Sequence, residues 1–326
     1  MDPITHSLVG LHLARRPALR GLPAAPRLLL ALSASLAPDV DRHLLAPFRE
    51  ALLPLGPAGI LHSLPGAALT ACLLAAVARP LVPAEGRRAA AVLAALAVAL
   101  HLIVDALTAD GLPLAWPLAS DRVGLAWLAS PDPWLWFLLA LPLLGGRLRR
   151  PRERRVLDLA PTRSGVVPLV LLYLGICAVT KARAELAAER FLPDDAQVET
   201  IQAYPLGPGP LLWAVLARTT DETWHRARFT LAGGLRPDGS LPTGATDPRM
   251  QIALDTREGR AFLAMARAPF LAHATEVAED GSFEVGLGDL RFGDPARGRL
   301  SWVLWLRLDP TFSPEEWRMI RTPLPP

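Results

Sequence analysis

Histidine and aspartate side chains recur within the apolar first part of the chain, at spacings that suggest metal or proton chemistry. His101 and Asp105 lie four residues apart in an otherwise uncharged run, so a helix would place both on one face, one turn apart. A carboxylate inside a membrane span is costly unless it is paired or bound to a metal. The pair therefore indicates metal binding or proton transfer, although an aspartate exposed at the helix end beside a hydrogen-bonded histidine would give the same pattern.

Further groups of the same types precede this pair. The candidate metal ligands are His6, Asp39, Asp41, His62, His101 and Asp105. Mixed imidazole and carboxylate ligands favour Zn, with Mn or Fe as alternatives, over Ca or Mg. Such an ion would supply hydroxide near neutral pH, and Asp105 or Asp110 could act as the general base. Taken singly, His6 and the Asp39–Asp41 pair are also typical of helix caps and helix ends.

Apolar runs that could cross a membrane dominate the same part of the chain. Four of them reach a membrane-spanning length when extended by a few residues; they cover residues 60–78, 89–104, 131–146 and 164–180. Two shorter apolar helices are expected before them, at about 4–14 and 28–37. Charged residues make up 20% of the chain, below the roughly 25% of soluble domains. The sequence therefore predicts a six-segment helical membrane bundle rather than a soluble enzyme.

Arginines divide the loops between these segments into two classes. The loops after the first, third and fifth segments are rich in Arg, with six of them at positions 147–155, whereas residues 39–59 and 109–130 contain few. The positive-inside rule places the Arg-rich loops in the cytoplasm. The alternate loops, and everything after about residue 185, are then expected outside. This topology puts all six candidate ligands at the outer side, and it explains the basic pI without nucleic-acid binding.

From about residue 195 the pattern changes to short β-prone runs separated by Gly, Pro and Asp turns. We expect one helix at 257–267 and strands at 198–204, 212–219, 223–231, 249–255, 271–278, 283–287 and 299–308. Sequences such as Arg236-Pro-Asp-Gly239 are predicted to be turns. The predicted fold is a helical multi-pass membrane domain, residues 1–190, that carries the metal site, followed by a soluble mainly-β (α+β) domain, residues 191–326.

The motifs resemble the YdjM-like inner-membrane proteins, a family described as membrane-bound metal-dependent hydrolases. The resemblance rests on Met1-Asp-Pro-Ile-Thr-His6-Ser, Ala37-Pro-Asp39-Val-Asp41, Gly59-Ile-Leu-His62-Ser63 and His101-Leu-Ile-Val-Asp105-Ala-Leu-Thr108, and it continues through Gly111–Trp116-Pro117, Asp132-Pro133 and Pro205–Trp213. It implies a multi-pass hydrolase with a metal on its His/Asp motifs. The family pattern His-Arg-Gly-x-Thr-His-Ser is altered here, because Pro57-Ala58 replace His-Arg and Leu61 replaces Thr.

The expected function is therefore hydrolysis of an amphiphilic substrate, such as a lipid or phosphoester, at the outer face of a bacterial inner membrane. Arg122 is a candidate for binding an anionic headgroup. Membrane lipids are expected partners, whereas the sequence identifies no protein partner for the β domain. The missing His-Arg pair favours one alternative, a non-enzymatic scaffold whose extracytoplasmic β domain binds an envelope partner. A second alternative is an ion-coupled transporter using His101 and Asp105, against which the lack of a repeated half argues.

Overall fold

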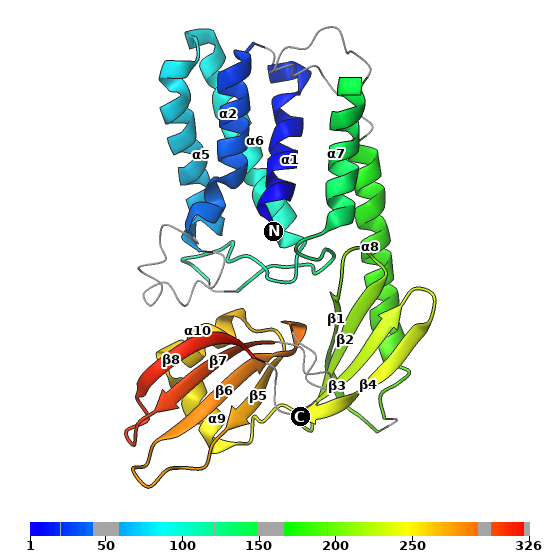
Figure 1. Cartoon of the computed structure of the whole chain (residues 1–326), viewed down its shortest axis with the longest axis vertical. Helices are drawn as coiled ribbons and strands as arrows, with labels where there is room; N and C mark the ends of the chain where they lie inside the picture. The colour runs from blue at the N-terminus through cyan, green and yellow to red at the C-terminus, as the bar shows by residue number, and fades with distance from the viewer. Residues whose placement is uncertain are drawn as a thin grey trace. The chain divides into compact units, whose positions relative to one another are not determined.

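The computed structural model describes residues 1–19, 21–41, 59–119, 121–148, 166–193, 195–292 and 301–322. The chain divides into two compact units. The helical unit comprises Met1–Phe48, Pro57–Val179 and Gly207–Pro210, and the β unit comprises Arg49–Gly56, Thr180–Leu206 and Leu211–Pro326. Figure 1 shows helices in the first unit and two sheets in the second. The predicted fold class, a helical membrane part followed by a mainly-β part, is confirmed.

The helices of the first unit match the six predicted segments. Among the described residues they are α1 (Pro3–Ala14), α2 (Ala24–Leu36), α5 (Leu64–Ala78), α6 (Arg87–Ala106), α7 (Pro133–Leu148) and α8 (Val166–Ala188). Three stretches are long and apolar enough to cross a membrane, namely Leu64–Leu81, Ala84–Ala106 and Val166–Ala188. The apolar helix Pro133–Leu144 falls short of that length. The span predicted at residues 131–146 is therefore present as a shorter helix.

Small side chains allow these helices to pack closely around α6. The buried core of this region includes Ala31 and Ala34 of α2 and Ala94 and Ala97 of α6, and small residues let helix backbones approach one another in a membrane. Gly10 of α1 lies close to α2: a Cβ there would lie 2.8 Å from Ser35 Oγ and 3.0 Å from the Ala31 carbonyl oxygen. This contact fixes α1 against α2, and with it the position of the start of α1.

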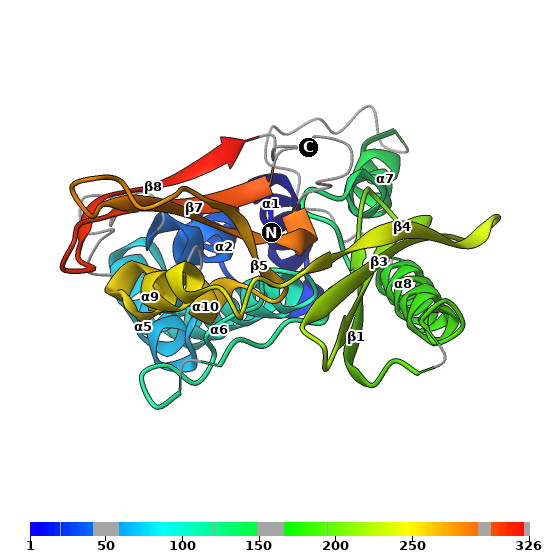
Figure 2. The same cartoon turned by 90° about the horizontal axis from the view of Figure 1, so that it is seen from below.

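The β unit contains two four-stranded antiparallel sheets, each with its strands in sequential order. The first contains β1 (Val198–Pro205), β2 (Leu212–Thr219), β3 (Thr223–Thr230) and β4 (Gly234–Pro242). The second contains β5 (Pro269–Ala274), β6 (Phe283–Asp289), β7 (Ser301–Leu308) and β8 (Pro314–Thr322). Two helices, α9 (Pro248–Asp255) and α10 (Arg257–Met265), lie along one face of the second sheet (Figure 2), where Met250 and Phe262 join its buried core.

Two details of the predicted β domain are wrong. Residues 249–255, expected to be a strand, form α9. Asp247 caps this helix by accepting a hydrogen bond from the Arg249 amide, and Pro248 occupies its first turn, a combination that favours helix initiation. The predicted turn Arg236–Gly239 lies inside β4, where a register shift opposite Arg226 and Ala227 accommodates the extra residue. β4 is an edge strand, and edge strands tolerate proline.

Candidate metal centre

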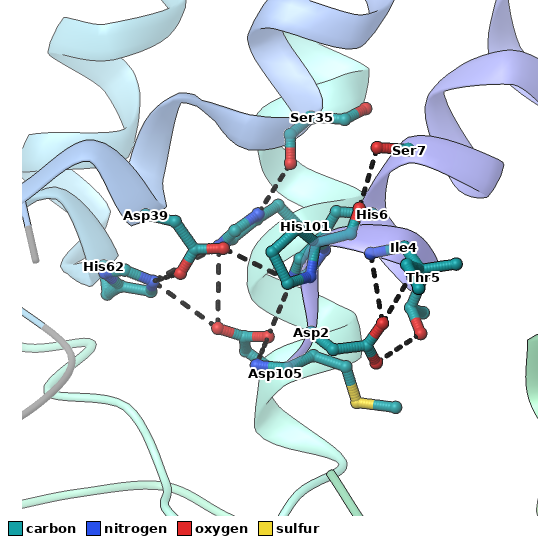
Figure 3. Close-up of polar contacts among 12 residues, drawn as sticks. Asp2, Ile4, Thr5, His6, Ser7, Ser35, Asp39, His62, His101 and Asp105 are labelled. Atoms are coloured by element: carbon teal, nitrogen blue, oxygen red, sulfur yellow. Dashed lines mark hydrogen bonds and ion pairs between the residues drawn. The ribbon is translucent and has the colours of Figure 1, made fainter. Parts of the chain in front are cut away.

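One end of the helical unit gathers acidic and histidine side chains from four separate elements and from a residue that follows one of them. It is the end where the chain begins and α6 ends (Figure 1). Two short 3-10 turns, η2 (Ala37–Asp39) and η5 (Ile60–His62), contribute alongside the helices. The residues that converge there are His6 of α1, Asp39 of η2, His62 of η5, and His101 and Asp105 of α6 (Figure 3). Asp41, just after η2, lies beside His62.

The start of α1 is fixed by a helix cap that can be read from the sequence. The Asp2 carboxylate accepts hydrogen bonds from the amides of Ile4 and Thr5 at 3.1 and 3.0 Å, and Pro3 occupies the first turn. The same carboxylate accepts a hydrogen bond from Trp136 Nε1 of α7 at 2.9 Å. His6 therefore lies in the second turn of a well-anchored helix, with a side chain that is buried.

The turn that carries His62 is equally constrained. Ser63 caps α5 by accepting a hydrogen bond from the Gly66 amide at 3.1 Å, and its hydroxyl donates to the Ile60 carbonyl at 2.7 Å. A Cβ at Gly66 would lie 2.1 Å from that same carbonyl oxygen, so only glycine lets η5 fold back over α5. On the other side, the Asp41 carboxylate accepts a hydrogen bond from the Leu61 amide at 3.2 Å.

Four side chains bring one ligand atom each to a common point. His62 Nε2 lies 3.2 Å from His101 Nε2, 3.4 Å from Asp105 Oδ2 and 3.6 Å from Asp39 Oδ1. His101 Nε2 lies 3.5 Å from Asp105 Oδ2, and all four atoms fall within 4.8 Å of one another. His62, His101 and Asp105 are at most 2% exposed. The group therefore forms a small buried polar centre rather than a set of solvated side chains.

Neighbouring groups orient both imidazoles toward that centre. His101 Nδ1 lies 2.8 Å from the Ser35 carbonyl oxygen, which can only accept, so Nδ1 carries the proton and Nε2 presents a lone pair in the neutral ring. His62 Nδ1 lies 3.5 Å from Asp41 Oδ2, which favours the same tautomer. Metal-binding histidines usually direct their second nitrogen at a carbonyl or carboxylate in this way. Asp41 is thus placed to orient His62.

The centre carries an excess of negative charge. The Asp105 Oδ1 atom lies 3.0 Å from His6 Nε2 and 2.5 Å from the amino group of Met1, while Asp39 and Asp41 add two more carboxylates. Burial opposes ionisation of Asp39, but hydrogen bonding with His62 and the charges of His101 and His6 hold the pKa of its carboxyl below the usual range. Buried carboxylates require compensating cations. A divalent ion would meet that requirement.

The residues present fit a metal ion. A tetrahedral zinc with bonds of about 2.0–2.1 Å separates its ligand atoms by roughly 3.3 Å, and the four measured separations run from 3.2 to 3.6 Å. Two imidazole Nε2 atoms that face each other at 3.2 Å need either a proton or a metal ion between them, because two lone pairs repel. The donor set of two imidazoles and two carboxylates suits Zn, Mn or Fe.

The other candidates from the sequence lie at varying distances from the four ligand atoms. His6 stacks on the His101 ring, with centroids 3.8 Å apart, and so borders the four-atom group. Thr108 donates to the Asp105 carbonyl at 2.7 Å, which closes the end of α6. Arg122 donates to the backbone carbonyls of Asp110 and Gly111 at 3.2 and 2.8 Å. Among the described residues, no contact joins the Asp110 carboxylate to the cluster. Pro57 and Ala58, which replace the His-Arg of the family pattern, lie outside the described residues.

Sequence reasoning missed two partners of the cluster. One is the Ser35 carbonyl, and the other is the Met1 amino group. Neither belongs to a side chain, so no pattern of side-chain types could have singled them out.

Comparison with known proteins identifies a family for the helical part of the chain. A family model described as YdjM inner membrane protein matches residues 1–185, which include every member of the cluster and all six helices up to Glu185 of α8. No curated protein and no solved structure matches the chain. The family model covers more than half of the 326 residues. The chain therefore belongs to the YdjM inner membrane protein family.

Proposed function

We propose that this protein is a membrane hydrolase that acts through a divalent metal ion held by Asp39, His62, His101 and Asp105. The observation that carries the proposal is that the four ligand atoms lie within 4.8 Å of one another in a buried centre, with four of their six separations at 3.2 to 3.6 Å. Membership of an inner membrane protein family and three helices of membrane-spanning length support the location.

A bound divalent ion supplies two things, a water whose pKa falls toward neutrality and a Lewis acid that polarises the bond to be cleaved. Zinc is our first choice, with manganese or iron as alternatives. Four protein ligands fill a tetrahedral ion, so hydrolysis requires a fifth position. Zinc can expand to five ligands.

The chain's own residues can hold and move a proton beside this group. The Oδ2 atom of Asp105 faces the imidazoles of His62 and His101, and its Oδ1 atom lies 3.0 Å from His6 Nε2. Asp105 is therefore our candidate for the general base, with His6 Nε2 placed to donate a hydrogen bond to its second oxygen. Asp110 remains the second candidate base from the sequence.

We propose an amphiphilic substrate, such as a lipid or phosphoester, because the cluster lies at one end of apolar helices rather than midway along them (Figure 1). Arg122 is the candidate contact for an anionic group. Its guanidinium also donates to two loop carbonyls, so its replacement would loosen the loop as well. The distribution of arginines supports an outward orientation for this end and for the β unit.

The test is the metal content of full-length protein purified in detergent, measured by inductively coupled plasma mass spectrometry, together with hydrolysis of phospholipids and lipid phosphomonoesters. We expect about one metal ion per chain and its loss in His101→Ala and Asp105→Asn. His12→Ala is the matched control, because His12 lies on α1 but contacts the Leu139 carbonyl instead. Stoichiometric metal that survives both substitutions would exclude this site.

A scaffold function is the second candidate, because four protein ligands also describe a closed structural metal site. Metal-loaded protein that hydrolyses no member of the substrate panel, but unfolds at lower temperature after chelation, would support the scaffold over the hydrolase.

A further inference from the structure

The β unit contains a cavity between the end of α8 and the strands β3 and β4, with a volume of about 550 Å³. This is within the range of small-molecule sites, about 300–1,000 Å³. We propose that it binds one anionic amphiphile, an apolar chain that ends in a carboxylate or phosphate. The residues that carry the proposal are Arg183, Leu186, Arg190, Phe191, Phe229 and Leu235.

The helical wall of the cavity is a single stripe. Arg183, Leu186, Ala187 and Arg190 line it, and their spacing of three, four and seven residues places them on one face. Arg190 lies just past the end of α8, in a turn closed by a hydrogen bond from its amide to the Ala187 carbonyl at 3.3 Å. The stripe therefore presents a cation at each end and an apolar surface between them.

The opposite wall is apolar. Phe229 of β3 is buried and Leu235 of β4 is half-buried, and both belong to the core that α8 forms with the first sheet through Ala184 and Ala188. Leu186 is 63% exposed although it lines the cavity. An acyl chain lying along Leu186 would cover this leucine and gain the free energy of apolar burial.

The two arginines are available for an anion. Within the part of the chain that the structure describes, neither Arg183 nor Arg190 forms an ion pair or side-chain hydrogen bond. Their neighbour Glu185 is already engaged, since it pairs with Lys181 and accepts a hydrogen bond from the Ala203 amide at 3.0 Å. Guanidinium groups bind carboxylate and phosphate through charge-assisted hydrogen bonds. The charge of the cavity thus complements an anionic head.

The bilayer is the expected source of this ligand. The stretch Val166–Ala188 is long and apolar enough to cross a membrane, and it contains both Arg183 and Leu186. The stripe therefore begins where this helix reaches the membrane surface. The site is separate from the metal cluster, so the proposal stands whether or not the chain is a hydrolase.

The experiment uses full-length protein in neutral phosphatidylcholine nanodiscs and a diazirine fatty acid as the photoreactive probe. Its alcohol analogue tests the need for charge, and mass spectrometry of the labelled peptides locates the label. We expect labelling at residues 183–191 or 229–235 by the acid and little by the alcohol. Dodecyl phosphate should compete, whereas inorganic phosphate should not. Competition by inorganic phosphate would instead identify a site for free anions and overturn the bilayer assignment.

The variant Arg183→Gln/Arg190→Gln should reduce this labelling roughly tenfold or more, as expected for losing a charge-assisted hydrogen bond. Arg236→Gln is the matched control, because Arg236 is an exposed arginine beside Leu235 that does not line the cavity. His101→Ala should leave the labelling unchanged. Labelling elsewhere, equal labelling by the alcohol, or an equal loss in Arg236→Gln would overturn the proposal.

Discussion

The two units treat buried charge in opposite ways. In the β unit, Asp289 and Arg291 are buried together, and Arg291 donates to the carboxylate at 2.9 Å from only two residues away. In the helical unit, three carboxylates and three imidazoles come from four elements and the residue Asp41 after η2, and they share one centre. A local pair of opposite charges such as Asp289 and Arg291 is neutral without any further group. Convergence of carboxylates from distant segments needs nearby positive charge, which the Met1 amino group supplies in part and a metal ion could complete.

The units nevertheless share one local motif, which allows a controlled comparison. Ser63 caps α5 and Thr256 caps α10, and each hydroxyl accepts a hydrogen bond from the amide three residues on, at 3.1 and 3.0 Å. Each hydroxyl also donates to a carbonyl three residues back, at 2.7 Å in both cases. Gly66 and Gly259 occupy equivalent positions. Only the first of these turns carries a candidate metal ligand.

The largest effect is expected in the β unit. Asp289→Ala leaves Arg291 buried without its carboxylate, and breaking a buried pair costs about 3–5 kcal/mol. Chemical denaturation of the full chain should show this loss with unchanged metal content. Glu315→Ala is the control, because the Arg307–Glu315 pair is 47% and 50% exposed and should contribute only about 0–1 kcal/mol. A loss of metal in Asp289→Ala would show that metal binding in the helical unit depends on the stability of the β unit.

An intermediate effect is expected from Asp41→Asn. Asp41 Oδ2 lies 3.5 Å from His62 Nδ1, and removing such an orienting partner lowers metal affinity by about 10–100-fold. Competition with a fluorescent chelator measures the affinity. Asp238→Asn in the β unit carries the same change of charge, pairs with Arg228 at 2.9 Å, and should leave the affinity unaltered. An unchanged affinity in Asp41→Asn would remove Asp41 from the site.

The smallest effects come from the two caps. Ser63→Ala and Thr256→Ala should each cost about 1 kcal/mol of stability, as measured by thermal unfolding of the full chain. Only Ser63→Ala should also weaken metal binding, because it releases the turn that positions His62. If both variants bind metal as tightly as the unsubstituted protein, the turn does not position His62.

Much of the fold follows from local patterns in the sequence. The strand 212–219 was predicted with the bounds that the structure shows for β2, because a short continuous apolar run lies between clear turns. α9 and β4 were not predicted, because Asp247-Pro248 and Arg236-Pro-Asp-Gly239 each allow two local structures, and tertiary packing selects between them.

The cluster was accessible from the sequence by a different route. The distribution of arginines among the loops predicts that His6, His62 and His101 lie at one side of a membrane. The structure brings these three residues into contact. The division of roles was not accessible, because whether Asp41 binds an ion or orients His62 depends on distances of a few tenths of an ångström. Those distances are set by the close approach at Gly59, where a Cβ would lie 2.4 Å from Asp41 Oδ2.

The scattered origin of the four ligand atoms has a consequence for how the protein is made. Asp39 and His62 precede α6, whereas His101 and Asp105 both lie near its C-terminal end. During synthesis, a nascent chain that has not yet inserted α6 holds at most two of the four ligands. If an ion binds these four atoms, its capture therefore follows insertion of this helix.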